Sequence, residues 1–145
     1  MRRFSIVIAA AALMFCSAAL LAQKVTTPEE LDKTMKKIGP AQQAINKALM
    51  ANAYADAKTQ VQIVRQALTD AENFWTIKKK DDAIKFSREA IGKVDALDKA
   101  LSAPTPDNAA VMAAFKEIGG ACRNCHMTYR VQDENQQFIL KPGSV

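Results

Sequence analysis

Reactive side chains are scarce in this chain. Its 145 residues include one histidine, His126, and three cysteines, of which Cys16 lies in an apolar N-terminal stretch. No catalytic base, nucleophile or substrate site can be picked out, so we do not expect an enzyme. Glycine is also scarce, at five residues, and hydrophobic residues make up 49% of the chain, which excludes a disordered protein.

The N-terminus has the composition of a secretory signal peptide. A basic start precedes a long apolar run that ends in small residues before a polar boundary. We expect residues 1–22 to be removed by cleavage after Ala22, with Ala19 as the alternative, and the mature chain to reach the periplasm without stable membrane insertion. An uncleaved anchor and a lipoprotein acylated at Cys16 are competing interpretations, and the bulky Phe15 argues against the second.

The charge of the mature chain is modest. Cleavage would remove two arginines and no acid, so the net charge would fall from +5 to +3. That charge suits docking to an acidic patch on a partner protein, but it is too weak and too scattered to indicate nucleic-acid binding. The densest cluster, Lys78-Lys79-Lys80, is interpreted as a solvated turn between helices.

Helical periodicity runs through the remaining chain and predicts an all-α, antiparallel, up-down four-helix bundle over residues 23–131. The expected core stripes are Leu31, Met35, Ile38, Gln42, Ile45 and Leu49; Ala57, Val61, Val64, Leu68, Ala71 and Trp75; Ala83, Ser87, Ala90, Val94, Leu97 and Leu101; and Val111, Phe115, Ile118, Cys122, Cys125 and Tyr129. The boundary between the first two helices is weakly marked, with Asn52 and Asp56 both available as caps. No segment alternates with period two, so no sheet is expected, and residues 132–145 should form a loose tail.

Local signals mark three further positions. Thr27-Pro28-Glu29-Glu30 has the pattern of an N-cap, a first-turn proline and a capping box. Thr105-Pro106 is expected to open the last helix in the same way. Gly39-Pro40 predicts a kink within residues 36–40, because proline removes a backbone donor and clashes with the preceding turn.

The most specific motif is Cys-Arg-Asn-Cys-His at residues 122–126. Two thiols followed at once by an imidazole have the spacing for covalent haem attachment, with Cys122 and Cys125 as thioether anchors and His126 as an axial iron ligand. On a helix, the three side chains fall within an arc of roughly 100°, on what we expect to be the core-facing side. Gly119-Gly120 would leave room for the porphyrin in a continuous helix, although each glycine costs about 1 kcal/mol relative to alanine. A helix break at this pair is the alternative.

Residues 119–130, Gly-Gly-Ala-Cys-Arg-Asn-Cys-His-Met-Thr-Tyr-Arg, resemble the C-terminal motif of the cytochrome c′ and cytochrome c556 group, the class II c-type cytochromes. Phe74-Trp75, Asp82-Ala83, and Met35 followed by Ile38-Gly39-Pro40 are supporting features. The resemblance implies an exported four-helix bundle that carries one covalent haem c, with the distal haem face supplied by the first helix. It also allows a homodimer through the first two helices.

By this resemblance, Met35 occupies the distal position, which is methionine in low-spin electron carriers and a non-ligating apolar residue in gas-binding members. We therefore expect a low-spin carrier with His126 and Met35 on the iron, which exchanges electrons with redox partner proteins. The alternative is a five-coordinate protein that binds nitric oxide or carbon monoxide, with Met35 filling the core. Tyr129 and Arg130 match the Tyr-Arg pair of the family, and both are expected at a haem propionate or the pocket wall. The alternatives are core packing for Tyr129 and a solvated helix end for Arg130. Leu31 departs from the family, which often has an arginine there.

A third interpretation has no haem, only an exported bundle whose two remaining cysteines pair or hold a metal. Two thiolates and one imidazole are one ligand short of a closed zinc site, and an iron–sulfur cluster normally takes four ligands. A disulfide within one helical turn is also geometrically tight. Haem attachment uses all three side chains and is the leading hypothesis.

Overall fold

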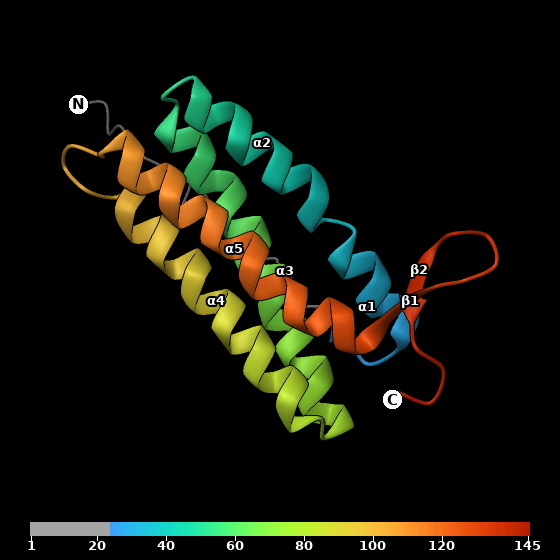
Figure 1. Ribbon diagram of the computed structural model, residues 1–145. Helices are drawn as coiled ribbons and strands as arrows, with labels where there is room; N and C mark the ends of the chain where they lie inside the picture. Colours follow the sequence, from blue (N-terminus) through green and yellow to red (C-terminus); the bar gives the residue numbers. More distant parts are fainter. Residues whose placement is uncertain (1–23) are drawn as a thin grey trace, which may run out of the picture.

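The computed structural model describes residues 24–145, and the expected signal peptide with its cleavage sites lies outside the described residues. Within this range there are five helices and two strands: α1 (Pro28–Met35), α2 (Ile38–Met50), α3 (Tyr54–Lys78), α4 (Asp81–Leu101), α5 (Asn108–Tyr129), β1 (Arg130–Gln132) and β2 (Phe138–Leu140). Figure 1 shows α1 and α2 end to end along one side, so that the described helices form four rods lying side by side. The chain is thus mostly helical, as predicted. No helix in the described range is long and apolar enough to cross a membrane.

The first rod is broken between α1 and α2. The kink predicted within residues 36–40 is confirmed, because residues 36 and 37 form a turn. Pro40 lies in the first turn of α2, where its missing N–H needs no partner within the helix. The capping box is confirmed as well. The Thr27 hydroxyl accepts from the Glu30 amide at 3.2 Å, and the Glu30 carboxylate accepts from the Thr27 amide at 3.0 Å.

The core follows the predicted stripes. Every residue of the second and third stripes is buried, and each residue of the first and fourth is either buried or half-buried. Among the described residues the core divides into two clusters. The larger contains Ile45, Leu49, Val61, Val94 and Ile118 among others. The smaller, called here the Trp75 cluster, consists of Val25, Leu31, Ala71, Phe74, Trp75, Ala83 and Tyr129.

The start of α5 differs from the prediction. The N-cap is Asp107, whose side chain accepts from the Ala109 amide at 3.1 Å, and the helix begins at Asn108. The expected cap at Thr105 is therefore wrong. Pro106 precedes the cap instead of opening the helix, because the carboxylate of the next residue satisfies the first free amide.

The start of α3 also departs from the expectation. Its N-cap is Ala53, without a side-chain hydrogen bond, so neither Asn52 nor Asp56 caps the helix. Asn52 instead closes the turn with φ 54°, a left-handed conformation that asparagine tolerates. Asp56 lies in the first turn, where the helix dipole favours a carboxylate. The turn between α3 and α4 is formed by Lys79, at φ 55°, and Lys80, whereas Lys78, which was expected in the turn, is the last residue of α3.

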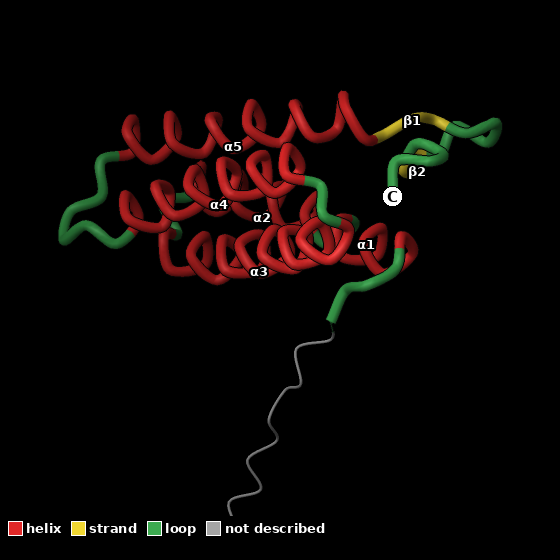
Figure 2. The backbone as a smooth tube through the Cα atoms, turned by 90° about the horizontal axis from the view of Figure 1, so that it is seen from below, coloured by secondary structure: helices red, strands yellow, loops and turns green. Residues whose placement is uncertain are grey.

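The C-terminal residues form a β-hairpin where no sheet was expected. β1 and β2 pair antiparallel, with Arg130 opposite Leu140, and Figure 2 shows the hairpin continuing directly from the end of α5. In the turn, the Asp133 carboxylate accepts from the amides of Asn135 at 2.9 Å and Gln137 at 2.8 Å. The prediction of a loose tail is wrong here, because turn hydrogen bonds hold two strands too short to show an alternating pattern.

Candidate functional site

Helix α5 carries the Cys-Arg-Asn-Cys-His motif and runs without a break through the Gly119-Gly120 pair, as predicted. Cys122 and Cys125 are half-buried and free, whereas His126 is exposed. The expected core-facing placement is therefore right for the two thiols and wrong for the imidazole. One residue beyond Cys125 is about 100° further around the helix, which carries His126 past the edge of the core stripe.

The two thiols lie at the boundary between the core and the open side of α5. Cys122 packs against the larger cluster and Cys125 against the Trp75 cluster. Burial raises the pKa of both thiols. The pKa of Cys125 reaches about 11, because interactions with Cys122 and then with the Asp82 carboxylate oppose its ionisation in addition to burial. Both cysteines are therefore protonated and poorly nucleophilic at neutral pH.

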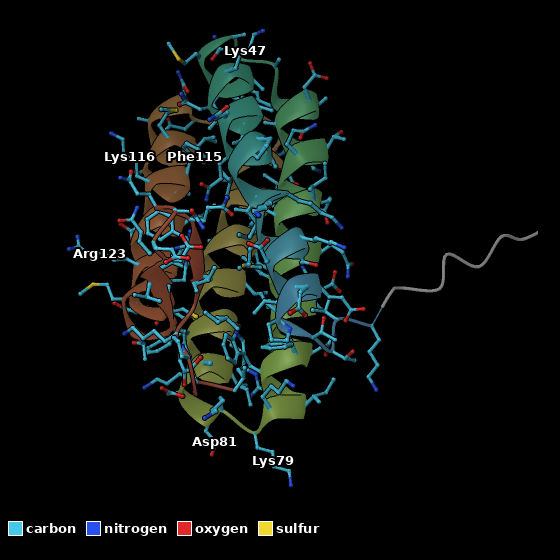
Figure 3. All side chains as sticks on the ribbon, turned by 90° about the vertical axis from the view of Figure 1, so that its right-hand side faces the viewer. Lys47, Lys79, Asp81, Phe115, Lys116 and Arg123 are labelled. Atoms are coloured by element: carbon cyan, nitrogen blue, oxygen red, sulfur yellow. The ribbon has the colours of Figure 1, made fainter. Side chains whose placement is uncertain are left out.

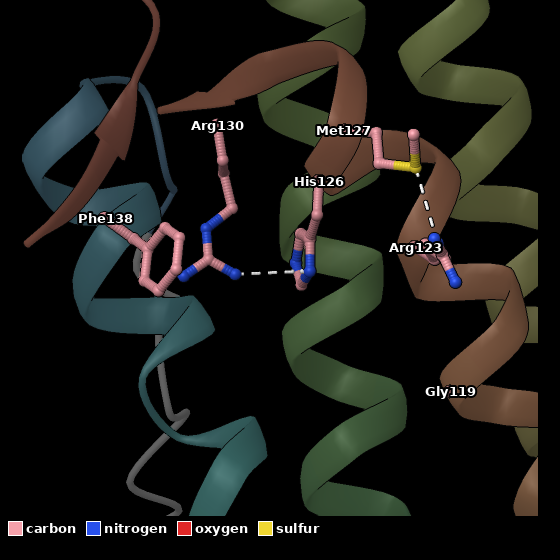
Figure 4. Close-up of a pocket in the computed structure, with 6 residues that line it drawn as sticks. All are labelled: Gly119, Arg123, His126, Met127, Arg130 and Phe138. Atoms are coloured by element: carbon pink, nitrogen blue, oxygen red, sulfur yellow. Dashed lines mark hydrogen bonds between the residues drawn. The ribbon is translucent and has the colours of Figure 1, made fainter. Parts of the chain in front are cut away.

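His126 lines an open cavity of ≈ 480 Å³ beside α5. The lining residues are Gly119, Arg123, His126, Met127, Arg130 and Phe138. This volume lies within the range of roughly 300–1,000 Å³ typical of small-molecule and cofactor sites. Figure 4 shows the His126 ring pointing away from α5 into the space in front of α3, with Arg130 and Phe138 beside it. Arg123 projects outward from the bundle in Figure 3 and is exposed.

Arg130 links His126 to the hairpin. Its Nη1 lies 3.2 Å from Nδ1 of His126, and its guanidinium carbon lies 4.3 Å from the centroid of the Phe138 ring. A guanidinium can only donate, so Nδ1 is the acceptor and the neutral ring carries its proton on Nε2. Although His126 is exposed, partial desolvation and then the charge of Arg130 lower its pKa. The neutral imidazole is the form that binds metals.

Tyr129 belongs to the core and does not line the cavity. Its side chain is buried, its ring centroid lies 4.6 Å from that of Trp75, and its hydroxyl donates to Asp82 Oδ1 at 2.5 Å. Burial, followed by the bond to Asp82, raises the pKa of Tyr129 to about 12, and the same bond lowers the pKa of Asp82. Of the two roles predicted for Tyr129, core packing is the one the structure shows.

Met35 is the last residue of α1, directly before the break. It is half-buried and packs against the Trp75 cluster, as Cys125 does, but it does not line the cavity. Met50 is 76% exposed at the far end of α2, and Met112 packs against the larger cluster. Met35 therefore shares a cluster with Cys125, as Met112 does with Cys122, and the role of Met35 as an iron ligand stays a prediction.

Sequence reasoning missed three residues of the cavity wall, Arg123, Met127 and Phe138. Met127 is 65% exposed and accepts a hydrogen bond from Arg123 Nε at 3.4 Å. Phe138 reaches the wall from β2, although the residues between it and α5 are mostly polar. The apolar triplet at residues 138–140, isolated in a polar tail, was the available signal that this segment packs on the domain.

The donor types at this site, two thiols and one imidazole, fit a covalently attached haem. Among residues 24–145, no group of three or more His, Cys, Asp or Glu side chains converges as a metal site requires. The two thiols lie one turn apart on one face, the imidazole lines the adjoining cavity, and a Cβ atom built on Gly119 would meet nothing within 4 Å. The residues that line this cavity include His126 and Gly119 but neither cysteine.

Comparisons of the chain with protein-family models, with curated proteins and with solved structures each gave no match.

Proposed function

We propose that this chain is a periplasmic c-type cytochrome with one haem attached through Cys122 and Cys125, and that it works in electron transfer. The observation that carries the proposal is the arrangement on α5, where two half-buried free thiols and a neutral imidazole lie within about one turn beside an open cavity. In this proposal residues 1–22 are removed on export. The mature chain is an antiparallel up-down four-helix bundle that resembles the class II c-type cytochromes.

Each residue of the site has a separate chemical role in this proposal. Cys122 and Cys125 form the thioethers, and His126 supplies the axial nitrogen. For Nε2 to act as a ligand, the ring proton must move to Nδ1, and Arg130 must then stop donating to that atom. When bound, the haem supplies a one-electron couple whose potential depends on its axial ligands and on nearby charge.

Met35 is proposed as the second axial ligand. It is half-buried and packs on the same cluster as Cys125, and the break after it gives α1 an orientation separate from α2. A thioether opposite an imidazole raises the reduction potential and closes the site to small ligands, as an electron carrier requires.

One observation favours the second function, a five-coordinate protein that binds nitric oxide or carbon monoxide. Met35 packs against the apolar Trp75 cluster and does not line the cavity that holds His126. A methionine retained in that position fills core space and leaves the distal side free.

The partners in this proposal are redox proteins that dock by electrostatic attraction. Arg123 and Arg130 line the cavity, and no acidic residue is among the residues that line it. A basic cavity mouth attracts an acidic partner surface and raises the rate of encounter at low ionic strength.

Intact mass after denaturation tests the proposal. The full chain, produced in a host that matures c-type cytochromes, should lose its first 22 residues, gain the mass of one haem and retain no alkylatable thiol. Alkylation must follow unfolding, because burial raises the pKa of both thiols and would slow the reaction in the folded protein. The Cys122→Ala/Cys125→Ala variant is the control and should be exported without added mass. Colourless mature protein with both thiols alkylated would overturn the proposal.

A further inference from the structure

The hairpin is anchored to the bundle on the side that faces the cavity. Leu140 packs against the Trp75 cluster, and Phe138, two residues earlier on the same strand, lies over the guanidinium of Arg130. Residues two apart on a strand share a face, so one face of β2 supplies both contacts. Ile139 points to the other face and is 42% exposed.

Two hydrogen bonds tie the end of the hairpin to the last turn of α5. The Lys141 amide donates to the Tyr129 carbonyl at 2.9 Å, and Lys141 Nζ donates to the Met127 carbonyl at 3.0 Å. These are carbonyls at a helix C-terminus, which have no partner within the helix and favour a cation. These bonds, together with Leu140, hold the end of β2 against the last turn of α5 within three residues of Phe138.

We propose that the C-terminal hairpin is a positioning element, in which Phe138 holds the Arg130 guanidinium beside His126 and so sets the charge next to that ring. Arg130 has two partners, the Nδ1 atom of His126 and the face of Phe138. The contact with Phe138 does not depend on which nitrogen of His126 carries the proton. Phe138 therefore keeps the guanidinium in place when Nε2 becomes the ligand and Nδ1 is protonated.

The consequence for electron transfer rests on the proposed function. A positive charge close to an axial ligand favours the reduced form of the metal, which carries less positive charge, and so raises the reduction potential. Arg130 cannot accept a hydrogen bond from Nδ1, so it does not make the ring more basic as a carboxylate or carbonyl would. Phe138 is a positioning residue that acts on the potential only through Arg130.

The first test is the midpoint potential of the mature, haem-loaded chain. Arg130→Gln should lower the potential, and Phe138→Ala should lower it in the same direction. Phe138→Tyr, which keeps an aromatic face, and Ile139→Ala, on the other face of β2, should keep the wild-type potential. Because Phe138 acts through Arg130, adding Phe138→Ala to Arg130→Gln should cause no further decrease. The proposal is overturned if Phe138→Ala leaves the potential unchanged, or if it lowers the potential equally in the wild-type and Arg130→Gln proteins.

A second readout separates this proposal from the haem assignment. His126 is the only histidine of the chain, so a long-range ¹H–¹⁵N spectrum of its ring reports one site. If the mature chain is colourless, the same variants are compared at a pH where the ring is neutral. Phe138→Ala should move the Nδ1 resonance toward its position in Arg130→Gln, whereas Phe138→Tyr and Ile139→Ala should leave it unchanged. A wild-type Nδ1 resonance in Phe138→Ala overturns the hairpin proposal independently of the haem.

Discussion

The Tyr129 hydroxyl donates to Asp82 Oδ1 at 2.5 Å and so joins the last residue of α5 to the first turn of α4. The ring of Tyr129 packs on Trp75 in the buried cluster, while Asp82 is exposed at a helix start that favours its negative charge. This bond holds the end of α5 in place one turn after Cys125. The geometry of the thiols therefore depends partly on a contact between residues 47 positions apart.

Removal of that hydroxyl should weaken the domain modestly. We expect Tyr129→Phe to lower the free energy of unfolding by about 1 kcal/mol, because one hydrogen bond to a charged group is lost while the ring packing is kept and Asp82 remains hydrated. Urea denaturation with an unchanged m-value would measure it. Tyr54→Phe is the control, since that hydroxyl bonds Asn52 Oδ1 at 3.1 Å at the surface and should contribute less. Equal losses in the two variants would contradict the prediction.

The same bond predicts how the difference between wild type and Tyr129→Phe varies with pH. The bond lowers the pKa of Asp82 below its ordinary 3.8, so the stabilisation is present above that value and is lost as the pH falls through the lower folded pKa. Burial and the bond raise the pKa of Tyr129 from 10.0 to about 12, so the stabilisation is present below pH 10 and is lost as the pH rises to about 12. The difference should be constant between about pH 5 and 9. If the unfolding free energies of wild type and Tyr129→Phe converge within this range, the bond between Tyr129 and Asp82 is not the source of the difference.

Much of the fold could be predicted because its signals are local. The stripe from Ala83 to Leu101 repeats every three or four residues, so helical geometry alone places it on one face. The capping box at Thr27 and the kink near Pro40 likewise depend only on neighbouring residues. The hairpin could not be predicted in this way, since each strand has three residues and Leu140 is held by a cluster assembled from distant segments.

The candidate site likewise has features that local sequence signals predict and features that depend on the folded structure. The spacing of Cys122, Cys125 and His126 fixes their order around α5, whatever surrounds the helix. The burial of each side chain depends on where the other helices lie, so the exposure of His126 could not be read from the motif. The contact of Arg130 with Phe138 requires a chain reversal that only the folded hairpin provides.

The two glycines of α5 give a prediction that tests where the cofactor lies. An added Cβ would meet nothing within 4 Å at either position, but only Gly119 lines the cavity. In haem-free protein, Gly119→Ala and Gly120→Ala should each stabilise the helix by about 0.5–1 kcal/mol. In loaded protein, Gly120→Ala should keep this gain and Gly119→Ala should lose it, because its methyl group would meet the macrocycle.

Thermal or urea unfolding of both variants, with and without haem, measures the effect. The Cys122→Ala/Cys125→Ala background supplies the haem-free protein. Equal gains for the two glycines in the loaded state would show that the haem does not cover Gly119.

Met35 and Met112 form a matched pair for testing the distal ligand. Both are half-buried methionines packed against apolar clusters, Met35 against the Trp75 cluster and Met112 against the larger one. In haem-free protein, truncation of either side chain removes similar packing, so each alanine variant should lose a similar stability, about 1–2 kcal/mol at a half-buried position. Only Met35→Ala should change the absorption spectrum of the loaded protein, because only that variant removes a proposed ligand.

Carbon monoxide then decides between the two proposed functions. If Met35 is a ligand, the reduced wild type and Met112→Ala should not respond to the gas, whereas reduced Met35→Ala should bind it with a clear shift of its main absorption band. If Met35 only fills the core, the wild type itself should bind the gas, and Met35→Ala should have the wild-type spectrum in both oxidation states. The stability losses in haem-free protein would be alike in the two cases, so the spectra of the loaded protein assign the role of Met35.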